Sequence, residues 1–220
     1  MLMRSLGKNV GQSRHRGSGF SLIEMTMVLA ISIIVSVVSV MSLVPAMQQY
    51  RLSNAYNTTL AAMRQARDNA VSQRTSYSVT FTTSVTPLIN TITVAPTLAG
   101  FQGDQNTVTY TLPTDVAFLA QTGLPSTGPD GFGAGTTAID FGWTGSGTGS
   151  GGSNVIYFCP DGSSQAASSC AANWSGGVVY IARNGDLLSS RAITLWGGTG
   201  RVHGWRLYSN GGGGYQWLRQ

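Results

Sequence analysis

Residues 19–24, which read Gly-Phe-Ser-Leu-Ile-Glu, decide the fold together with the apolar run that continues behind them to about Met47. A basic segment precedes them, and its charged residues are Arg4, Lys8, Arg14 and Arg16. Glu24 lies just inside the apolar segment, and no charged residue follows it from Met25 through Tyr50. A carboxylate inside a membrane-length helix is unfavourable by roughly 2.5–3.5 kcal/mol on insertion scales. Glu24 is therefore a candidate functional residue that requires a partner.

Two ordinary explanations of this stretch are a secretory signal peptide and a plain membrane anchor. A signal peptide has an apolar core of roughly 7–15 residues followed by a small-residue cleavage site. This run is longer, and no such site follows it. The uncharged span covers about 39 Å as a helix with a rise of about 1.5 Å per residue, which is enough to cross a bilayer. An anchor alone explains neither Glu24 nor Gly19.

The stretch resembles the processing site of type IV pilins and type II secretion pseudopilins. The resemblance implies that a prepilin peptidase cleaves between Gly19 and Phe20 and methylates the new amino terminus at Phe20. Glu24 is then the fifth residue of the mature chain, and the family places this carboxylate against the terminal amine of a neighbouring subunit during filament assembly. Glycine suits the cleavage site because it has no side chain to obstruct a protease.

The net charge agrees with a removable leader. The chain has 13 Lys and Arg residues against eight Asp and Glu, a formal charge of +5. Four of the 13 lie in the leader, so its removal leaves nine bases against eight acids. We interpret the basic leader as a positive-inside signal that keeps the N-terminus in the cytoplasm, rather than as a nucleic-acid-binding segment.

The region from Phe20 to about Gln73 is expected to form one long helix in two parts. The membrane part carries Ser32, Ser36 and Ser39 on one face, where they either pack against neighbouring helices or bond preceding carbonyls. Pro45 is expected to kink the helix because it lacks an N–H. In the second part an apolar stripe predicts a docking face for a sheet. Its members are Leu52, Tyr56, Leu60, Met63, Ala66 and Ala70.

From about Ser76 the pattern alternates with period two, which predicts strands. The candidate strands are Tyr77–Phe81, Ile89–Val94, Thr107–Leu112, Val116–Leu119, Ala138–Phe141, Val155–Phe158, Val178–Ala182, Ala192–Trp196, Val202–Tyr208 and Tyr215–Leu218. Asn184-Gly185 predicts a hairpin after Val178–Ala182. The Gly-rich stretch 142–152 predicts a surface loop. The fold class is α+β, similar to H-type minor pseudopilins and related minor pilins. The expected parts are the leader 1–19, a membrane and filament-core helix 20–50, an amphipathic helix 51–74 and a β-rich head 75–220.

Cys159 and Cys170 are the only cysteines of the chain. The orientation places them outside the cytoplasm, where disulfides persist, and we expect a bond between them worth about 2–4 kcal/mol. A metal pair and two free thiols remain as alternatives.

From the sequence we do not expect an enzyme, and we expect neither a cofactor nor a metal site. His15 leaves with the leader, so His203 is the one histidine of the mature chain, and no Gly-x-Ser-x-Gly motif occurs. Asp130 and Asp161 precede glycines, which favours ordinary turns over calcium. The Trp and Tyr residues of the strands are interpreted as core or rim packing.

The C-terminal quarter concentrates positive charge. From Thr75 through Ala182 the chain has no Lys or Arg, whereas five arginines occur from Arg183 to the end. This region resembles the DNA-uptake minor pilins, which bind DNA with a Gly-Arg-x-Arg loop, and the candidate DNA contacts are Arg201 and Arg206. Gly200-Arg201 matches the start of that motif, but His203 occupies the place of the second arginine. The alternative is a structural Gly-Arg turn of the kind found in H-type pseudopilins.

Two functions follow as hypotheses. The first is a minor pseudopilin or minor pilin, a subunit of a type II secretion or type IV pilus-like filament that takes part in filament initiation and protein secretion. The second is a DNA-binding minor pilin for natural transformation. The implied partners are the prepilin peptidase, other subunits through the N-terminal helix, the inner membrane and, in the second case, DNA. Both hypotheses place the chain in the bacterial inner membrane as a single-pass protein with its head in the periplasm or exposed on a filament. A membrane-tethered domain that never polymerises is a third possibility.

Overall fold

A computed structural model describes residues 19–85, 88–97, 107–144, 152–171 and 173–220. The basic residues of the leader lie outside this range. The chain divides into two compact units, Met1–Pro45 and Ala46–Gln220, with the boundary directly after Pro45. The second unit contains the β-rich head.

Helix α1 spans Leu22–Gln73, which confirms the single long helix, although it begins two residues after Phe20. Every residue from Leu22 through Pro45 is exposed. This is the one helix of the described chain that is long and apolar enough to cross a membrane. The helix continues through Pro45, and Arg74, which has a left-handed φ of 52°, follows its last residue.

The head contains two antiparallel sheets. The first has the strand order β3-β2-β1-β6-β7, and the second has the order β11-β10-β9-β8-β4, with β5 also paired to β8. The strands are β1 (Tyr77–Val85), β2 (Leu88–Pro96), β3 (Val108–Thr111), β4 (Ala117–Phe118), β5 (Ile139–Trp143), β6 (Val155–Phe158), β7 (Ser164–Gln165), β8 (Gly176–Ala182), β9 (Arg191–Trp196), β10 (Arg201–Ser209) and β11 (Tyr215–Arg219). Two short 3-10 helices, η1 (Pro129–Gly131) and η2 (Leu187–Ser189), lie in the connections. The α+β fold class is therefore confirmed.

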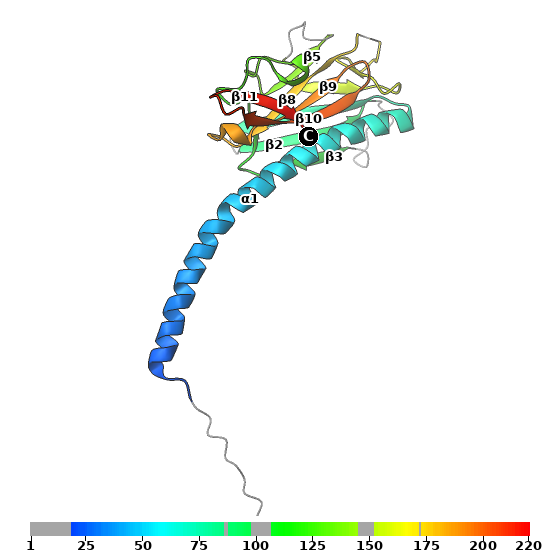
Figure 1. Cartoon of the computed structure of the whole chain (residues 1–220). Coiled ribbons are helices and arrows are strands. Elements are labelled where there is room, and N and C mark those ends of the chain that lie inside the picture. Colours follow the sequence, from blue (N-terminus) through cyan, green and yellow to red (C-terminus); the bar gives the residue numbers. More distant parts are fainter. Residues whose placement is uncertain (1–18, 86–87, 98–106, 145–151, 172) are drawn as a thin grey trace, which may run out of the picture. The chain divides into compact units, whose positions relative to one another are not determined.

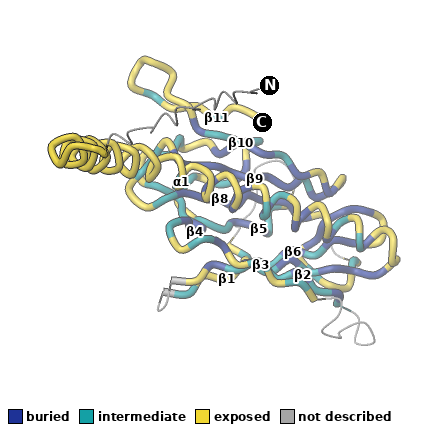
Figure 2. The backbone as a smooth tube through the Cα atoms, turned by 90° about the horizontal axis from the view of Figure 1, so that it is seen from below, coloured by how far each residue is buried: buried dark blue, intermediate teal, exposed yellow. Residues whose placement is uncertain are grey.

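The second part of α1 runs along the β-rich head (Figure 1). Its predicted stripe is buried except for Leu60, which is half-buried. The stripe joins one hydrophobic core with residues of both sheets, such as Phe81 and Phe158 of the first and Ile193 and Leu195 of the second. In Figure 2 the buried backbone is concentrated in the central strands of the second sheet. One helix face therefore holds two sheets together.

Strand β8 is buried along its whole length. Val179 and Ile181 belong to the core under α1, whereas Val178 and Tyr180 belong to a second cluster on the opposite face of the sheet. Phe132, which follows η1, covers part of this second face. Burial on both faces explains why β8 reads as a continuous apolar run rather than an alternating one.

The expected hairpin β8–β9 is confirmed; Gly185 of Asn184-Gly185 has a positive φ, and the connection continues through η2 before β9 begins. One local expectation needs correction. Gly142 and Trp143 belong to strand β5 and not to a loop; residues 145–151 of that loop lie outside the described chain. Strand β7 was not expected because two polar residues carry no alternating pattern.

The buried contact between α1 and the sheets predicts the effect of truncating Met63, whose side chain is 0% exposed. We expect Met63→Ala to lower the free energy of unfolding of the head by about 2–5 kcal/mol, because the change leaves a cavity between helix and sheets. Denaturant unfolding of the full chain in detergent micelles, followed by near-UV circular dichroism, measures this difference. Met63→Leu nearly conserves volume and should lose less than about 1.5 kcal/mol; equal losses in both variants would contradict the packing described here.

Candidate functional site

The N-terminal candidates lie at the exposed start of the first unit. Gly19 and Phe20 precede α1, Phe20 is 74% exposed, and apart from the two neighbouring residues no described part of the chain lies within 4 Å of the position of a Gly19 Cβ. Glu24 lies in the first helical turn. The ion pairs within the described chain involve other residues. The Glu24 carboxylate is therefore available to a group outside this subunit.

The three serines of the membrane part bond their own helix. The hydroxyls of Ser32, Ser36 and Ser39 donate to the carbonyl oxygens four residues earlier, at 2.7, 2.7 and 2.8 Å. This satisfies their donors inside an apolar segment. Because each hydroxyl bonds to its own helix, the serine face projects little from the backbone, and a neighbouring helix can approach it closely.

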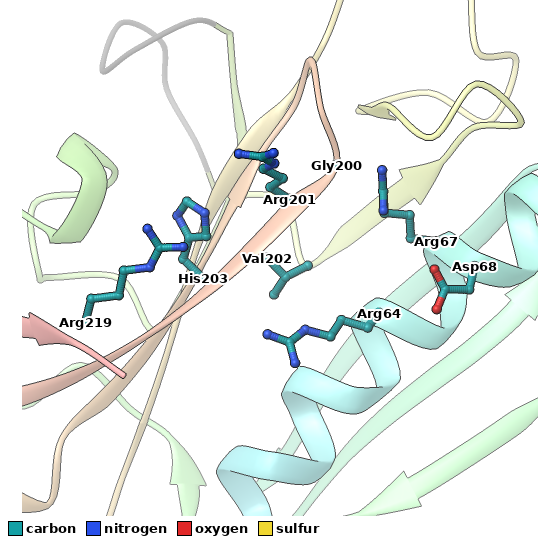
Figure 3. Close-up of a pocket in the computed structure, with 8 residues that line it drawn as sticks. All are labelled: Arg64, Arg67, Asp68, Gly200, Arg201, Val202, His203 and Arg219. Atoms are coloured by element: carbon teal, nitrogen blue, oxygen red, sulfur yellow. The ribbon is translucent and has the colours of Figure 1, made fainter.

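A basic pocket of about 330 Å³ lies between α1 and the last two strands. We define the basic pocket by Arg64, Arg67, Asp68, Gly200, Arg201, Val202, His203 and Arg219. Figure 3 shows three of these side chains arising from α1 and the others from the turn before β10, from β10 and from β11. Four guanidinium groups against one carboxylate favour a ligand with several negative charges.

The two residues of the Gly-Arg turn differ in role: Gly200 is required by the backbone, whereas the Arg201 side chain is exposed. Gly200 has a φ of 58°, and a Cβ there would lie 2.1 Å from the carbonyl oxygen of Gly162, so this position requires glycine. The same carbonyl accepts a hydrogen bond from Arg67 Nε at 3.2 Å, which fixes one wall of the basic pocket. Arg201 is exposed and lines the pocket. Gly200 thus shapes the turn, whereas the Arg201 side chain faces solvent and the pocket.

Arg206, the second candidate DNA contact, is not part of the basic pocket. It lies five residues after Arg201 on the same strand, so the alternation of side chains directs the two toward opposite faces of the sheet. Its guanidinium lies 5.1 Å from the centroid of the Tyr208 ring, and its Nε is buried without a hydrogen-bond partner. The structure therefore separates two residues that the sequence motif had grouped.

Arg206 instead pairs across the sheet with Arg191. Arg191 is buried, and its Nη1 donates to the carbonyl oxygens of Ser189 and Ser190 at 3.4 and 3.3 Å. Burial, together with the nearby charge of Arg206, lowers the pKa of Arg191 to about 10. These contacts give Arg191 a role in holding the connection before β9.

His203 connects the basic pocket to the loop that contains η1. Its Nδ1 lies 2.9 Å from Asp130 Oδ2, which also accepts a hydrogen bond from the Thr194 hydroxyl at 2.5 Å. Trp205 Nε1 donates to the same hydroxyl at 3.0 Å. Burial alone would raise the pKa of Asp130, but hydrogen bonds from Thr194, His203 and Trp196 outweigh it and hold the pKa below its usual value.

The sequence predicts only a turn at Asp130. It does form a turn with a φ of 56°, but its carboxylate also joins segments that lie 64 and 73 residues away. Asp161 is an ordinary turn residue, since its Oδ1 accepts hydrogen bonds from the Ser163 amide and hydroxyl at 2.9 and 2.7 Å. The described residues contain no group of three or more His, Cys, Asp or Glu side chains that could hold a metal.

Cys159 and Cys170 form the expected disulfide, with their Cα atoms 5.8 Å apart. The bond closes a loop that contains Gly162, whose carbonyl contacts Arg67 of α1. This covalent link therefore fixes a segment that lies beside the basic pocket.

The long apolar N-terminal helix, the antiparallel sheets packed on its second part and the disulfide together form a pilin-like architecture. Comparison of the chain with protein families, curated proteins and solved structures finds no match.

The Asp130 network predicts a dependence of stability on pH. Because the folded pKa of Asp130 lies below its unfolded value near 3.8, the network stabilises the fold fully above that value and loses this contribution as pH falls through the folded pKa. We expect Asp130→Asn to unfold more easily at pH 6 and to lose less stability than wild type between pH 5 and pH 2. Denaturant unfolding across this range measures both effects.

Asp68→Asn serves as the matched control, because Asp68 is exposed and outside this network. It should keep the wild-type loss of stability between pH 5 and pH 2. A wild-type pH profile in Asp130→Asn would exclude the network as the source of this dependence.

Proposed function

We propose that this chain is a minor pseudopilin or minor pilin, a structural subunit that helps to initiate and assemble a type II secretion or type IV pilus-like filament. The observation that carries the proposal is the helix segment Leu22–Pro45, which is predominantly apolar and fully exposed, and which contains Glu24, a carboxylate that forms no ion pair within the described residues. Such a segment needs a bilayer before assembly and other apolar helices after it.

Glu24 supplies a specific polar contact for this association. A buried carboxylate is tolerated when a cation pairs with it. Cleavage between Gly19 and Phe20 would create an amine in a neighbouring subunit at the same level of the helix bundle. The exposed position of both residues supports access by a prepilin peptidase. Processing and assembly are therefore linked through one ion pair.

The head supports a position outside the cytoplasm. Its disulfide suits an oxidising compartment, and the basic leader retains the N-terminus on the opposite side of the inner membrane. The proposed role is that of a structural subunit and not an enzyme: it requires no cofactor and acts through contacts with other subunits. Its partners are the prepilin peptidase, other pilin-like subunits and the membrane.

A second candidate function is DNA binding for natural transformation, and the basic pocket is the observation that favours it. Arg201 from the Gly-Arg turn is joined there by Arg64, Arg67 and Arg219. Guanidinium groups gathered in one concave site can contact successive phosphates of a nucleic-acid backbone. The helix arginines would supply the positive charge that the incomplete Gly-Arg-x-Arg motif lacks.

Replacement of Glu24 tests the filament proposal. We expect Glu24→Ala to be processed to a mature chain that begins at methylated Phe20, yet to decrease in the filament fraction by about tenfold or more, because one partner of a buried ion pair is lost. N-terminal sequencing and quantitative immunoblotting of sheared filaments measure the two results. Met25→Ala is the control and should assemble normally. An intact Met1 in working protein, or normal assembly of Glu24→Ala, would favour a tethered domain instead.

Single replacements around the basic pocket test the DNA proposal. We expect Arg201→Ala and Arg64→Ala each to weaken binding of the full chain to double-stranded DNA and to reduce the salt dependence by about one unit. Gel-shift titrations at several salt concentrations measure this. Arg206→Ala and Arg51→Ala remove the same charge outside the pocket and should bind like wild type; equal losses in all four variants would indicate nonspecific attraction.

A further inference from the structure

A second pocket of about 310 Å³ lies where β9 turns into β10 and β8 begins. We call it the tryptophan pocket, and its lining residues are Phe132, Trp143, Trp174, Gly176, Trp196, Gly197, Gly198 and Thr199. The sequence predicts core or rim packing for the tryptophans of the predicted strands, and of these Trp196 lines the pocket. Trp143, Trp174 and the phenyl ring of Phe132 converge on the same cavity from other segments.

Trp174 is an exposed aromatic member of this pocket, with 61% of the residue accessible. The backbone beside it is nevertheless firmly held, because the Ser175 amide donates to the Ser164 carbonyl and the Ser164 amide donates to the Gly197 carbonyl, both at 2.8 Å. A Cβ at Gly198 would lie only 3.1 Å from the indole ring, so the ring lies directly against this glycine. A large exposed aromatic ring on a rigid segment favours a binding surface.

Trp196 and Phe132 form an ordered wall of the pocket. Their ring centroids lie 5.2 Å apart with the planes at 74°, an edge-to-face arrangement. Phe132 also belongs to the apolar cluster on this face of the second sheet, so the wall is supported from behind. The aromatic surfaces are thus largely positioned before any ligand arrives, which reduces the entropy lost on binding.

The chemistry of the lining limits the ligand. No side chain of the tryptophan pocket carries a charge, a carboxylate or a carboxamide, and the one hydroxyl, that of Thr199, already accepts from the Arg201 amide. The carbonyls of Trp196 and Gly197 accept from Gly200 and Ser164. A sugar would bury several hydroxyl donors here, and each buried donor without an acceptor costs about 1–3 kcal/mol. A charged ligand would lose hydration without gaining an ion pair.

We propose that the tryptophan pocket binds an extended, proline-rich segment of a partner protein. Proline presents an apolar ring and has no backbone N–H, so it brings few donors to a lining that is poor in acceptors. Proline-rich segments also form a polyproline II helix before binding, and aromatic-lined grooves recognise this conformation. The proposal goes beyond filament assembly, because it concerns what the head captures rather than how the helix packs.

Binding of decaproline to the full-length mature chain in detergent micelles tests the proposal. Fluorescence anisotropy of a labelled peptide measures the affinity, and a glycine-serine peptide of equal length is the peptide control. We expect saturable binding of decaproline that Trp174→Ala weakens by about tenfold or more, as is usual for a central aromatic contact. Trp174→Phe should retain an intermediate affinity. Tyr215→Ala removes a surface aromatic side chain of β11 outside the pocket and should bind like wild type.

Three outcomes would overturn the proposal: no saturable binding of decaproline, equal binding by wild type and Trp174→Ala, or binding of cellohexaose that depends on Trp174 while decaproline fails to bind. If Trp174→Ala does not fold, the site is mapped instead by photocrosslinking a benzophenone-labelled decaproline to the wild-type chain. Crosslinks must then map to residues near Trp174 and Trp196; crosslinks elsewhere would refute the pocket as the site. Since filament recovery is measured separately, failure here leaves the assembly proposal unaffected.

Discussion

The helix segment that precedes Pro45 exposes apolar side chains on every side, and it needs apolar surroundings that the described part of the chain does not supply. A soluble domain would bury such a segment in its own core. This chain instead uses only the second part of α1 for its own packing, and the first part is exposed along its whole length, which is the basis of the proposed association with lipid and with other helices. The division explains why the head has a complete core of its own, built from Ala46 onward.

Within the head, the same helix that joins the two sheets also supplies one wall of the basic pocket. The buried stripe faces the sheets, and the arginines of the neighbouring face extend toward the Gly-Arg turn. The carbonyl oxygen of Gly162 connects the helix to the turn, since it accepts a hydrogen bond from Arg67 and lies against Gly200. The tryptophan pocket lies at the same turn between β9 and β10, because Gly197, Gly198 and Thr199 line it and the next residue, Gly200, lines the basic pocket. Core packing thus positions both concave surfaces.

Much of the fold could be predicted from local patterns, because helix α1 and most strands follow simple periodicities. The sites could be predicted only in part. The grouping of Arg64 with Arg201, and of Asp130 with His203, depends on contacts between distant segments that no local spacing encodes. One signal was available and was missed: Arg201 and Arg206 are an odd number of residues apart on one strand, so they could not share a face. The exposure of Trp174 was not predictable, because a single aromatic residue in a loop has no pattern to read.

The complete burial of β8 has a consequence for the chain before it is folded. The segment Val178–Ala182 combines high strand propensity with no charge and no proline, which is the composition of aggregation-prone sequences. Its partner β9 comes later in the chain, so one edge of β8 remains unpaired until β9 has formed. Arg183 directly follows the segment and acts as a charged gatekeeper against self-association. The interval before β9 pairs with β8 is therefore the period in which the chain is most prone to self-association.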